Sequence, residues 1–371
     1  MKWHAIGASA LGASHERAGT LNQDAIGWWP VDGEGPPLVL VISDGHGSPD
    51  CFRSDIGSRL ATEAASNVIR TFLEKNGEHG DSTLVKRLAE QHLPQRIVGE
   101  WKEKVGQHLL RYPLRAADAD SPGDYRGRLD NSALTKAVLE PLLVYGATLL
   151  AVAVTKDLVL YLQLGDGDIL AVSTDGSVTR PIAGDDRLVG NETTSLCQRD
   201  AWKEFRIGFG RSPESTPALI LVATDGYANS FREERDFRKA GSDILDSIRK
   251  EGVRWIDERL LGWLEDASRK GSGDDITVGL LVSSLMQAPS SRENSGGVGR
   301  KNELRDAPEL ATRPGLAGRT RTHPSREWKS FASASRLPRS IGEPKALGER
   351  QSCGLGGFAW GDVSESHGEG I

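Results

Sequence analysis

Short apolar runs alternate with longer amphipathic stretches over the first 285 residues of the chain. Runs rich in Val, Ile and Leu that end at Asp, Gly or Asn indicate strands, whereas apolar residues three or four apart indicate helices. These patterns predict strands at residues 38–42, 147–154, 158–165, 168–173, 218–223 and 276–282, and helices at 56–73, 84–110, 132–144, 242–250 and 254–270.

The order of these elements indicates the class of fold. The three strands between residues 147 and 173 follow one another through tight turns, which predicts a β-meander. We expect Pro94 to break the 84–110 helix and Pro141 to interrupt the 132–144 helix, because proline lacks a backbone donor. Consecutive strands with helices grouped between them favour an α+β fold of antiparallel sheets covered by helices over a doubly wound parallel sheet.

The composition changes after residue 285, where Pro, Ser, Gly and Arg replace the periodic apolar pattern. We therefore predict one folded domain over residues 1–285 and a disordered tail over residues 286–371. The tail has 13 Lys or Arg and 10 Asp or Glu, a charge of +3, so the net charge of −6 leaves −9 on the preceding residues. This acidic balance argues against nucleic acid as a partner.

Signals for membranes, export and disulfides are weak. No apolar run approaches the roughly 18 residues of a membrane span, and the N-terminal segment lacks the apolar core of a secretory signal. The three cysteines, Cys51, Cys197 and Cys353, fit neither a disulfide framework nor a Cys-rich zinc site. We expect a cytoplasmic protein with no membrane partner.

Aspartates next to glycines end or begin several of the predicted strands. Asp44, Asp166 and Asp225 each precede a glycine, Asp274 lies just before the last strand, and Asp24 lies near the N-terminus. One Asp-Gly pair is an ordinary turn signal, but five carboxylates brought together would repel one another unless cations neutralised them. Oxygen ligands of this kind suit Mg²⁺ or Mn²⁺.

The order and wording of these segments resemble the metal-dependent protein phosphatases of the 2C type, in particular a bacterial branch with Ser-His near the start and Gln-Asp-Ala after it. The resemblance runs from about residue 7 to 282. It rests on Ser-His and Gln-Asp-Ala within residues 14–25, Asp-Gly-His-Gly at 44–47, Gly-Ala-Thr at 146–148, Gly-Asp-Gly-Asp at 165–168, Thr-Asp-Gly at 224–226 and Asp-Asp-Ile-Thr at 274–277.

The resemblance implies a central antiparallel β-sandwich flanked by helices in four α-β-β-α layers, with two or three Mg²⁺ or Mn²⁺ ions at one end. Asp44 would be the ligand shared by two ions, and Gly45 would add its carbonyl to one of them. Asp225 and Asp274 would bind the other ion, and Asp166 a third, weaker one. Asp275 ranks below Asp274 because many relatives have Asn there.

The implied activity is the hydrolysis of phosphoserine and phosphothreonine by a metal-activated water, without a covalent enzyme intermediate. His46 matches the family's candidate general acid, although a histidine simply accommodated in a polar turn is the alternative. The implied partners are phosphorylated proteins and a cognate serine/threonine kinase. The segment 191–196 is expected to form a flap beside the active site.

Two departures from the family pattern affect the expected site. Gln23 stands where relatives have a ligand glutamate, so Asp24 is expected to compensate. Gly19 stands where relatives have a phosphate-binding arginine, which leaves Arg17 or His15 as the nearest replacement cation. Two alternatives therefore stay open: a catalytically weak, phosphoprotein-binding member of the same fold, and a metallohydrolase of small phosphoesters.

Overall fold

The computed structural model describes residues 1–76, 82–114, 136–184, 193–211 and 216–284 of the chain. Two antiparallel sheets form its centre, with strand orders β3-β1-β11-β10-β7-β8 and β2-β4-β5-β6-β9. The first contains β1 (Trp3–Ala10), β3 (Glu34–Gly35), β7 (Asp168–Val172), β8 (Val178–Thr179), β10 (Leu219–Ala223) and β11 (Ile276–Ser283). The second contains β2 (Ala25–Trp29), β4 (Leu38–Ser43), β5 (Leu149–Val154), β6 (Leu158–Leu164) and β9 (Arg206–Arg211).

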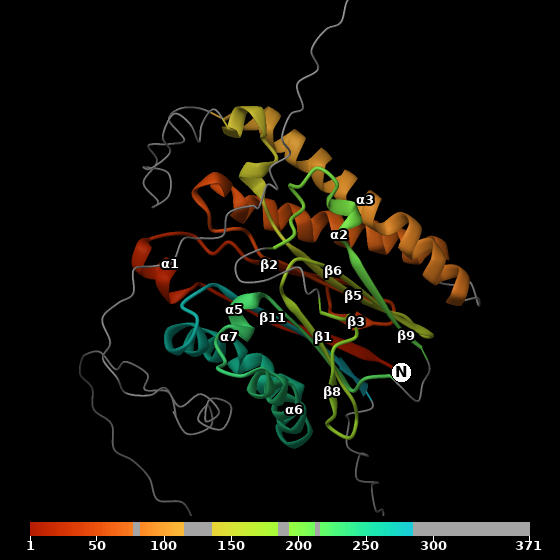
Figure 1. The fold of residues 1–371 in the computed structure, drawn as a ribbon. Helices are drawn as coiled ribbons and strands as arrows, with labels where there is room; N and C mark the ends of the chain where they lie inside the picture. The colour runs from red at the N-terminus through yellow and green to blue at the C-terminus, as the bar shows by residue number, and fades with distance from the viewer. Residues whose placement is uncertain (77–81, 115–135, 185–192, 212–215, 285–371) are drawn as a thin grey trace, which may run out of the picture.

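Helices cover the outer face of each sheet. Figure 1 shows α2 and α3 along one side of the sandwich and α6 and α7 along the other. The helices are α1 (Ala13–Ala18), α2 (Ser54–Asn76), α3 (Ser82–Arg111), α5 (Asp225–Ala228), α6 (Glu234–Glu251) and α7 (Val253–Lys270), with 3-10 turns at Pro49–Cys51, Leu143–Tyr145 and Ala201–Lys203. The four layers confirm the predicted α+β sandwich flanked by helices.

The strands are apolar on both faces because the sandwich has three hydrophobic layers. Leu38, Leu40 and Ile42 point into the core between the two sheets, whereas Val39 and Val41 belong to the core beneath α2 and α3. All five are fully buried. A strand buried on both faces appears in the sequence as a continuous apolar run instead of an alternating one, which is why this strand could be predicted.

The prediction of a three-stranded meander is wrong at its last strand. Strand β5 pairs with β6, but β7 belongs to the other sheet, where it pairs with β10 and β8. The connection between β6 and β7 crosses from one sheet to the other at Gly165, whose φ of 105° is in the left-handed region. Strand content and turn residues do not distinguish a hairpin from such a crossing.

The prediction of a break at Pro94 is also wrong. Helix α3 runs without interruption from Ser82 to Arg111 and contains Pro94 as a buried residue. Its apolar face packs on α2, and the Trp101 indole donates to the carbonyl of Gly57 at 3.1 Å. We infer that this packing offsets the one hydrogen bond that proline removes.

Five strands were not predicted from the sequence, namely β1, β2 and β9 and the two-residue strands β3 and β8. The predicted helix 242–250 is the second half of α6, which begins at Glu234. Of the predicted helix 132–144, residues 132–135 lie outside the described residues, 136–139 are helical and a 3-10 turn follows at 143–145, as the expected interruption near Pro141 requires. The predicted tail, 286–371, also lies outside the described residues.

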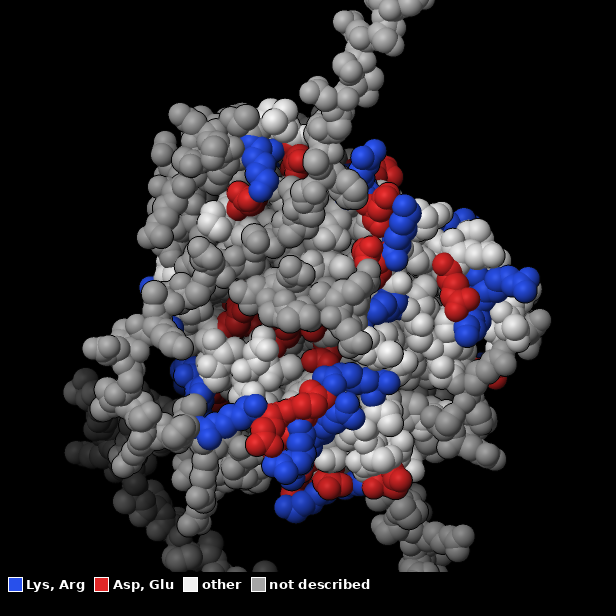
Figure 2. Space-filling view, viewed as in Figure 1, with Lys and Arg blue, Asp and Glu red and all other residues white. Residues whose placement is uncertain are grey.

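Charged side chains lie mainly on the helices. On the face shown in Figure 2, Lys and Arg side chains gather beside Asp and Glu, in line with pairs one turn apart such as Arg238 with Glu234 and Lys239 with Asp243 on α6. Acidic side chains are also visible set back in the middle of this face. No helix of the described residues is long and apolar enough to cross a membrane.

Candidate active site

Strand pairing brings the predicted aspartates to one end of the sandwich. Asp44 follows β4, and Asp24 lies beside it because Ala25 of β2 pairs with Ser43 of β4. In the other sheet Asp225 follows β10, and Asp274 precedes β11, whose residue Val278 pairs with Ala223. Asp166 lies in the crossing between β6 and β7. Residues far apart in the sequence thus meet at one edge.

The carboxyl groups at this edge raise one another's pKa. Burial raises the pKa of Asp44 well above its usual value, and the charges of Asp24, Asp225, Asp274 and Asp166 raise it further. Burial, together with Asp166 and Asp274, raises the pKa of Asp225 to about 7. A divalent cation would relieve the same repulsion.

This repulsion predicts an unusual pH dependence for the metal-free protein. The pKa of Asp225 is about 7 in the folded protein and near 3.8 when unperturbed, so the folded state binds this proton more tightly. The stability that Asp225 contributes is therefore complete below about pH 4 and is lost as the pH rises through 7. With EDTA, we expect the free energy of unfolding to be about 1–3 kcal/mol higher at pH 6 than at pH 8.

Thermal unfolding in EDTA at the two pH values measures this difference. Asp225→Asn should flatten the dependence, and saturating Mn²⁺ should reverse it, because a cation binds the ionised carboxylates. Equal melting temperatures of the wild-type protein at pH 6 and pH 8 in EDTA would contradict the raised pKa of Asp225.

The loop that carries Asp44 is fixed from behind by Thr148. The Thr148 hydroxyl accepts from the Asp44 backbone N–H at 3.1 Å, and the Thr148 N–H donates to the Asp44 carbonyl at 2.8 Å. Gly45 packs so tightly that a Cβ there would lie 2.6 Å from the Gln23 carbonyl oxygen and 2.7 Å from that of Ser54. Only glycine fits this position without moving the backbone.

His46 is part of the same loop, and its side chain is buried. Its side chain is 1% exposed, and a Cβ on Gly146 would lie 2.7 Å from the ring. Burial lowers the pKa of His46 to about 4. The Nε2 atom has no hydrogen-bond partner among the described residues. The His46 ring is thus enclosed against Gly146, and its Nε2 atom is itself buried.

Hydroxyl groups hold the two aspartates at the margin of the site. Asp24 accepts from the Thr224 hydroxyl at 2.9 Å, and Asp166 accepts from the Thr193 hydroxyl at 2.9 Å. Burial raises the pKa of both aspartates, and the charge of Asp275 adds to the effect on Asp24. Thr193 begins the described part of the predicted flap, whose residues 191 and 192 lie outside the described residues. The described part therefore lies beside Asp166.

The structure places the two candidate phosphate-binding residues, His15 and Arg17, differently. His15 and Arg17 are both on α1, but the Arg17 side chain is exposed and makes no hydrogen bond or ion pair with any residue that the structure describes. The His15 ring is 12% exposed and lies against the carboxylates of Asp274 and Asp275. Of the two, only His15 contacts the aspartate cluster.

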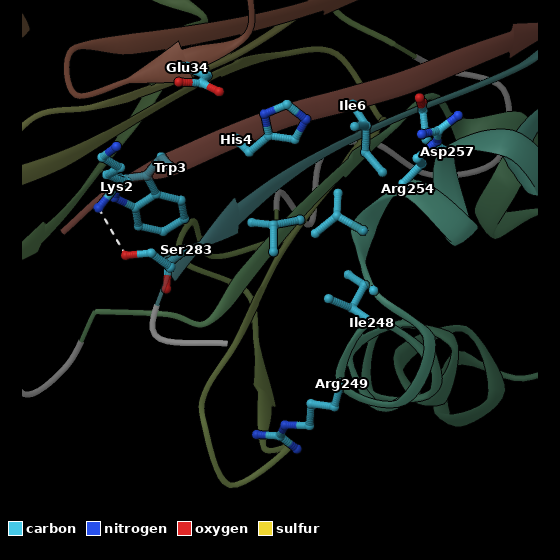
Figure 3. Close-up of a pocket in the computed structure, with 14 residues that line it drawn as sticks. Lys2, Trp3, His4, Ile6, Glu34, Ile248, Arg249, Arg254, Asp257 and Ser283 are labelled. Carbon is cyan, nitrogen blue, oxygen red and sulfur yellow. Dashed lines mark hydrogen bonds between the residues drawn. The ribbon is translucent and has the colours of Figure 1, made fainter. Parts of the chain in front are cut away.

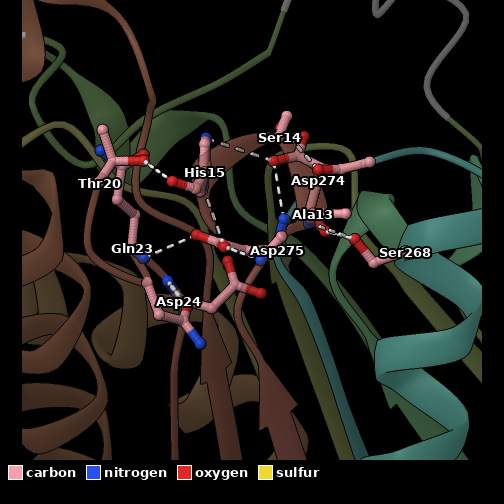
Figure 4. Close-up of polar contacts among 12 residues, drawn as sticks. Ala13, Ser14, His15, Thr20, Gln23, Asp24, Ser268, Asp274 and Asp275 are labelled. Atoms are coloured by element: carbon pink, nitrogen blue, oxygen red, sulfur yellow. Dashed lines mark hydrogen bonds and ion pairs between the residues drawn. The ribbon is translucent and has the colours of Figure 1, made fainter. Parts of the chain in front are cut away.

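Asp275 is the site residue whose role the sequence patterns missed. Its side chain is 4% exposed and accepts from the backbone N–H groups of Gly12, at 2.6 Å, and Gln23, at 2.8 Å. It also lies 3.0 Å from His15 Nδ1 (Figure 4). The only sequence signal was its place beside Asp274, which is 48% exposed. Neighbouring carboxylates in one motif therefore have different environments.

The donor set fits a hard divalent cation by its chemistry. Aspartate carboxylates and a nearby backbone carbonyl are the ligands that Mg²⁺ and Mn²⁺ prefer. Within the described ranges, however, no group of three or more His, Cys, Asp or Glu side chains is arranged to hold a metal ion. Burial and the charges of Asp166 and Asp274 raise the pKa of Asp225, and a bound cation would oppose this effect.

A separate cavity of about 780 Å³ opens at the opposite end of β1 and β11 (Figure 3). Trp3 and His4 at the start of β1, Ser283 at the end of β11, and Ile248 and Arg254 from α6 and α7 line it. None of the predicted site residues is among its lining residues. The candidate chemistry therefore belongs to the carboxylate end of the sandwich.

A family model of protein phosphatase 2C matches residues 11–265, and the chain belongs to this family. The match includes Asp44, His46, Asp166 and Asp225 and ends before Asp274. A search of curated proteins finds no match.

A search of solved structures gives several matches at low sequence identity. The catalytic domain of the serine/threonine protein phosphatase PstP, in complex with two manganese ions, is 17% identical, with coverage of 76% of this chain and 98% of that one and a TM-score of 0.44. The serine/threonine phosphatase Stp1 from Staphylococcus aureus is 14% identical, with 75% and 94% coverage and a TM-score of 0.46. PppA from Pseudomonas aeruginosa is 15% identical, with 76% and 99% coverage and a TM-score of 0.42.

Proposed function

We propose that the protein is a Mg²⁺- or Mn²⁺-dependent protein serine/threonine phosphatase. The observation that supports this most strongly is the set of partly buried aspartates at one end of the sandwich, whose pKa values are raised by burial and by one another's charge. Membership of the protein phosphatase 2C family supports the same reaction class. The substrates would be phosphorylated proteins, with a cognate serine/threonine kinase as a partner.

In this proposal the chain holds two or three divalent ions. Asp44, the Gly45 carbonyl, Asp225 and Asp274 would hold two of them, with Asp44 as the ligand common to both. Asp166 would hold a third ion, and Asp24 would add negative charge where Gln23 replaces a carboxylate. When bound, such ions supply an acidified water and neutralise charge on the phosphoryl oxygens.

Two histidines would act on the substrate itself. His15 would bind a phosphoryl oxygen, since its ring lies against Asp274 whereas Arg17 is exposed. His46 would donate a proton to the departing serine or threonine oxygen, which requires the charge of the bound phosphoryl group to raise the pKa of the ring from about 4 towards neutrality. No side chain needs to form a covalent bond with the phosphoryl group.

The substrate class is tested by comparing phosphoesters with the purified full chain. With Mn²⁺ present, we expect kcat/KM for phosphothreonine and phosphoserine peptides to exceed that for nucleotides and sugar phosphates by about tenfold or more, because an enzyme discriminates by contacts in the transition state. EDTA should abolish all turnover.

Other outcomes would redirect the proposal. Faster turnover of sugar phosphates than of phosphopeptides would support a small-phosphoester hydrolase. A folded protein that hydrolyses no phosphoester at any Mn²⁺ or Mg²⁺ concentration would contradict the enzyme proposal and support a phosphoprotein-binding role, for which the replacement of a carboxylate by Gln23 is the motivating observation.

A further inference from the structure

The Asp275 carboxylate joins three segments that are distant in the sequence. Its Oδ1 accepts from the Gly12 N–H at 2.6 Å and lies 3.0 Å from His15 Nδ1, and its Oδ2 accepts from the Gln23 N–H at 2.8 Å. Asp275 directly precedes β11, and Gly12 and Gln23 lie on either side of α1, so these contacts join β11 to the segment that contains α1 (Figure 4). Both carboxylate oxygens are therefore engaged within the chain.

The contacts on α1 hold the helix firmly in place. Ala13 donates its N–H to the Ser268 hydroxyl at 2.9 Å, and Ser14 donates both its N–H, at 2.8 Å, and its hydroxyl, at 2.6 Å, to the Gly273 carbonyl. The His15 carbonyl accepts from the Thr20 N–H at 3.0 Å. The backbone that carries His15 is thus fixed on both sides, and only its side-chain torsions need a further constraint.

The Asp275 carboxylate lies against the His15 ring at an ion-pair distance of 3.0 Å and limits its rotation. With Nδ1 at Asp275, the opposite nitrogen, Nε2, lies 3.9 Å from Asp274 Oδ1. Nε2 also lies 3.9 Å from the position that a Cβ on Gly47 would occupy. This nitrogen therefore faces the space between Asp274 and the loop that carries Asp44, where the proposed function requires the phosphoryl group.

We infer that Asp275 is a positioning residue that acts through His15, holding the imidazole so that Nε2 contacts a phosphoryl oxygen. The inference rests on the proposed function. A buried carboxylate packed behind one imidazole nitrogen restricts the direction in which the other nitrogen can point, as in other carboxylate–histidine pairs. Gly19 stands where relatives have a phosphate-binding arginine, and in this chain the pair of Asp275 and His15 takes the role of that arginine. In this inference Asp275 is not a metal ligand.

A double-mutant cycle of Asp275→Asn and His15→Ala tests this coupling. We expect Asp275→Asn alone to lower kcat/KM for a phosphothreonine peptide about 10–100-fold, the usual range for a supporting residue behind a site. In the His15→Ala background the same substitution should change kcat/KM by less than about twofold, because the residue through which it acts is gone. Glu16→Gln, an exposed carboxylate on α1, is the matched control and should leave kcat/KM unchanged.

The dissociation constant of inorganic phosphate, measured by calorimetry with Mn²⁺ present, should follow the same cycle without any turnover. Equal losses from Asp275→Asn in both backgrounds would overturn the inference, since Asp275 would then act through Gly12 or Gln23. If the Asp275→Asn variant does not fold, the His15→Ala variant is measured alone. A dissociation constant for phosphate equal to that of wild type would then overturn the inference.

The inference and the proposed function fail in different ways. A wild-type protein without phosphopeptide turnover contradicts the proposed function, whereas the phosphate-binding cycle still reports on the pair. An active wild type with an additive cycle contradicts the inference alone.

Discussion

Replacing Asp44 by asparagine is expected to lower Mn²⁺-dependent kcat/KM for a phosphothreonine peptide by about 10³-fold or more. Asp44 is the carboxylate that the other four aspartates influence, and the proposed metal site depends on it. Loss of metal-assisted charge stabilisation removes several kcal/mol from the transition state, and each ~1.4 kcal/mol is a factor of ten. Initial rates with purified variants measure the effect.

The same substitution should make the metal-free protein more stable, since it removes a partly buried carboxyl group that its neighbours repel. Asp50→Asn is the matched control, because Asp50 lies on the same loop but pairs with Lys136 at 2.6 Å. It should keep nearly full activity. An Asp44→Asn protein that retains wild-type kcat/KM, with or without a change in stability, would show that Asp44 is not a metal ligand in the reaction.

His46→Gln is expected to lower kcat for a phosphothreonine peptide by about 10²–10⁴-fold, the usual contribution of a general acid. The effect should nearly vanish with p-nitrophenyl phosphate, because p-nitrophenolate leaves without a proton. KM should change little if His46 acts only as the leaving group departs. The two substrates, assayed with the same variant, separate a general acid from a histidine that only fills a space.

The contrasting outcome is a similar fall in kcat for both substrates, together with a lower melting temperature. That result would indicate that the ring, 1% exposed and packed against Gly146, holds the Asp44 loop in place and transfers no proton.

The parts of the fold that the sequence predicted well are those buried on two faces. Strand β4 is a run of six residues, Leu38–Ser43, that are all buried, so its apolar pattern is continuous. Strand β1 has the mixed pattern of Trp3–Ala10, in which half of the residues are only partly buried, and it was missed. The order of apolar and polar residues along a strand reflects how deeply the strand is buried, so a strand of intermediate burial gives an ambiguous pattern.

The pairing of strands depends on tertiary contacts that local sequence does not contain. The Asp166-Gly167 turn looks like a hairpin, yet β7 joins the opposite sheet and pairs with β10. Pro94 similarly removes one backbone donor from α3, but packing against α2 maintains the helix. In both cases long-range packing overrides the local signal.

The candidate site was predictable where its residues end strands, and less so where they support others. Asp44, Asp225 and Asp274 could be predicted because turn residues lie beside them at the ends of apolar runs. Asp275 contacts Gly12, His15 and Gln23, more than 250 residues away, and no sequence spacing reveals such a set. The choice between Arg17 and His15 likewise required the direction of α1, which places only His15 against the carboxylates.

Titration of the metal-free wild-type protein with Mn²⁺, followed by calorimetry beside Asp44→Asn, tests the central claim most directly. The predicted result is that wild type binds at least two Mn²⁺ ions per chain, and that Asp44→Asn, although folded, loses at least the tighter of them. A folded wild type that binds no Mn²⁺, or an Asp44→Asn variant that binds it as wild type does, would contradict the assignment of the aspartate cluster as a metal centre.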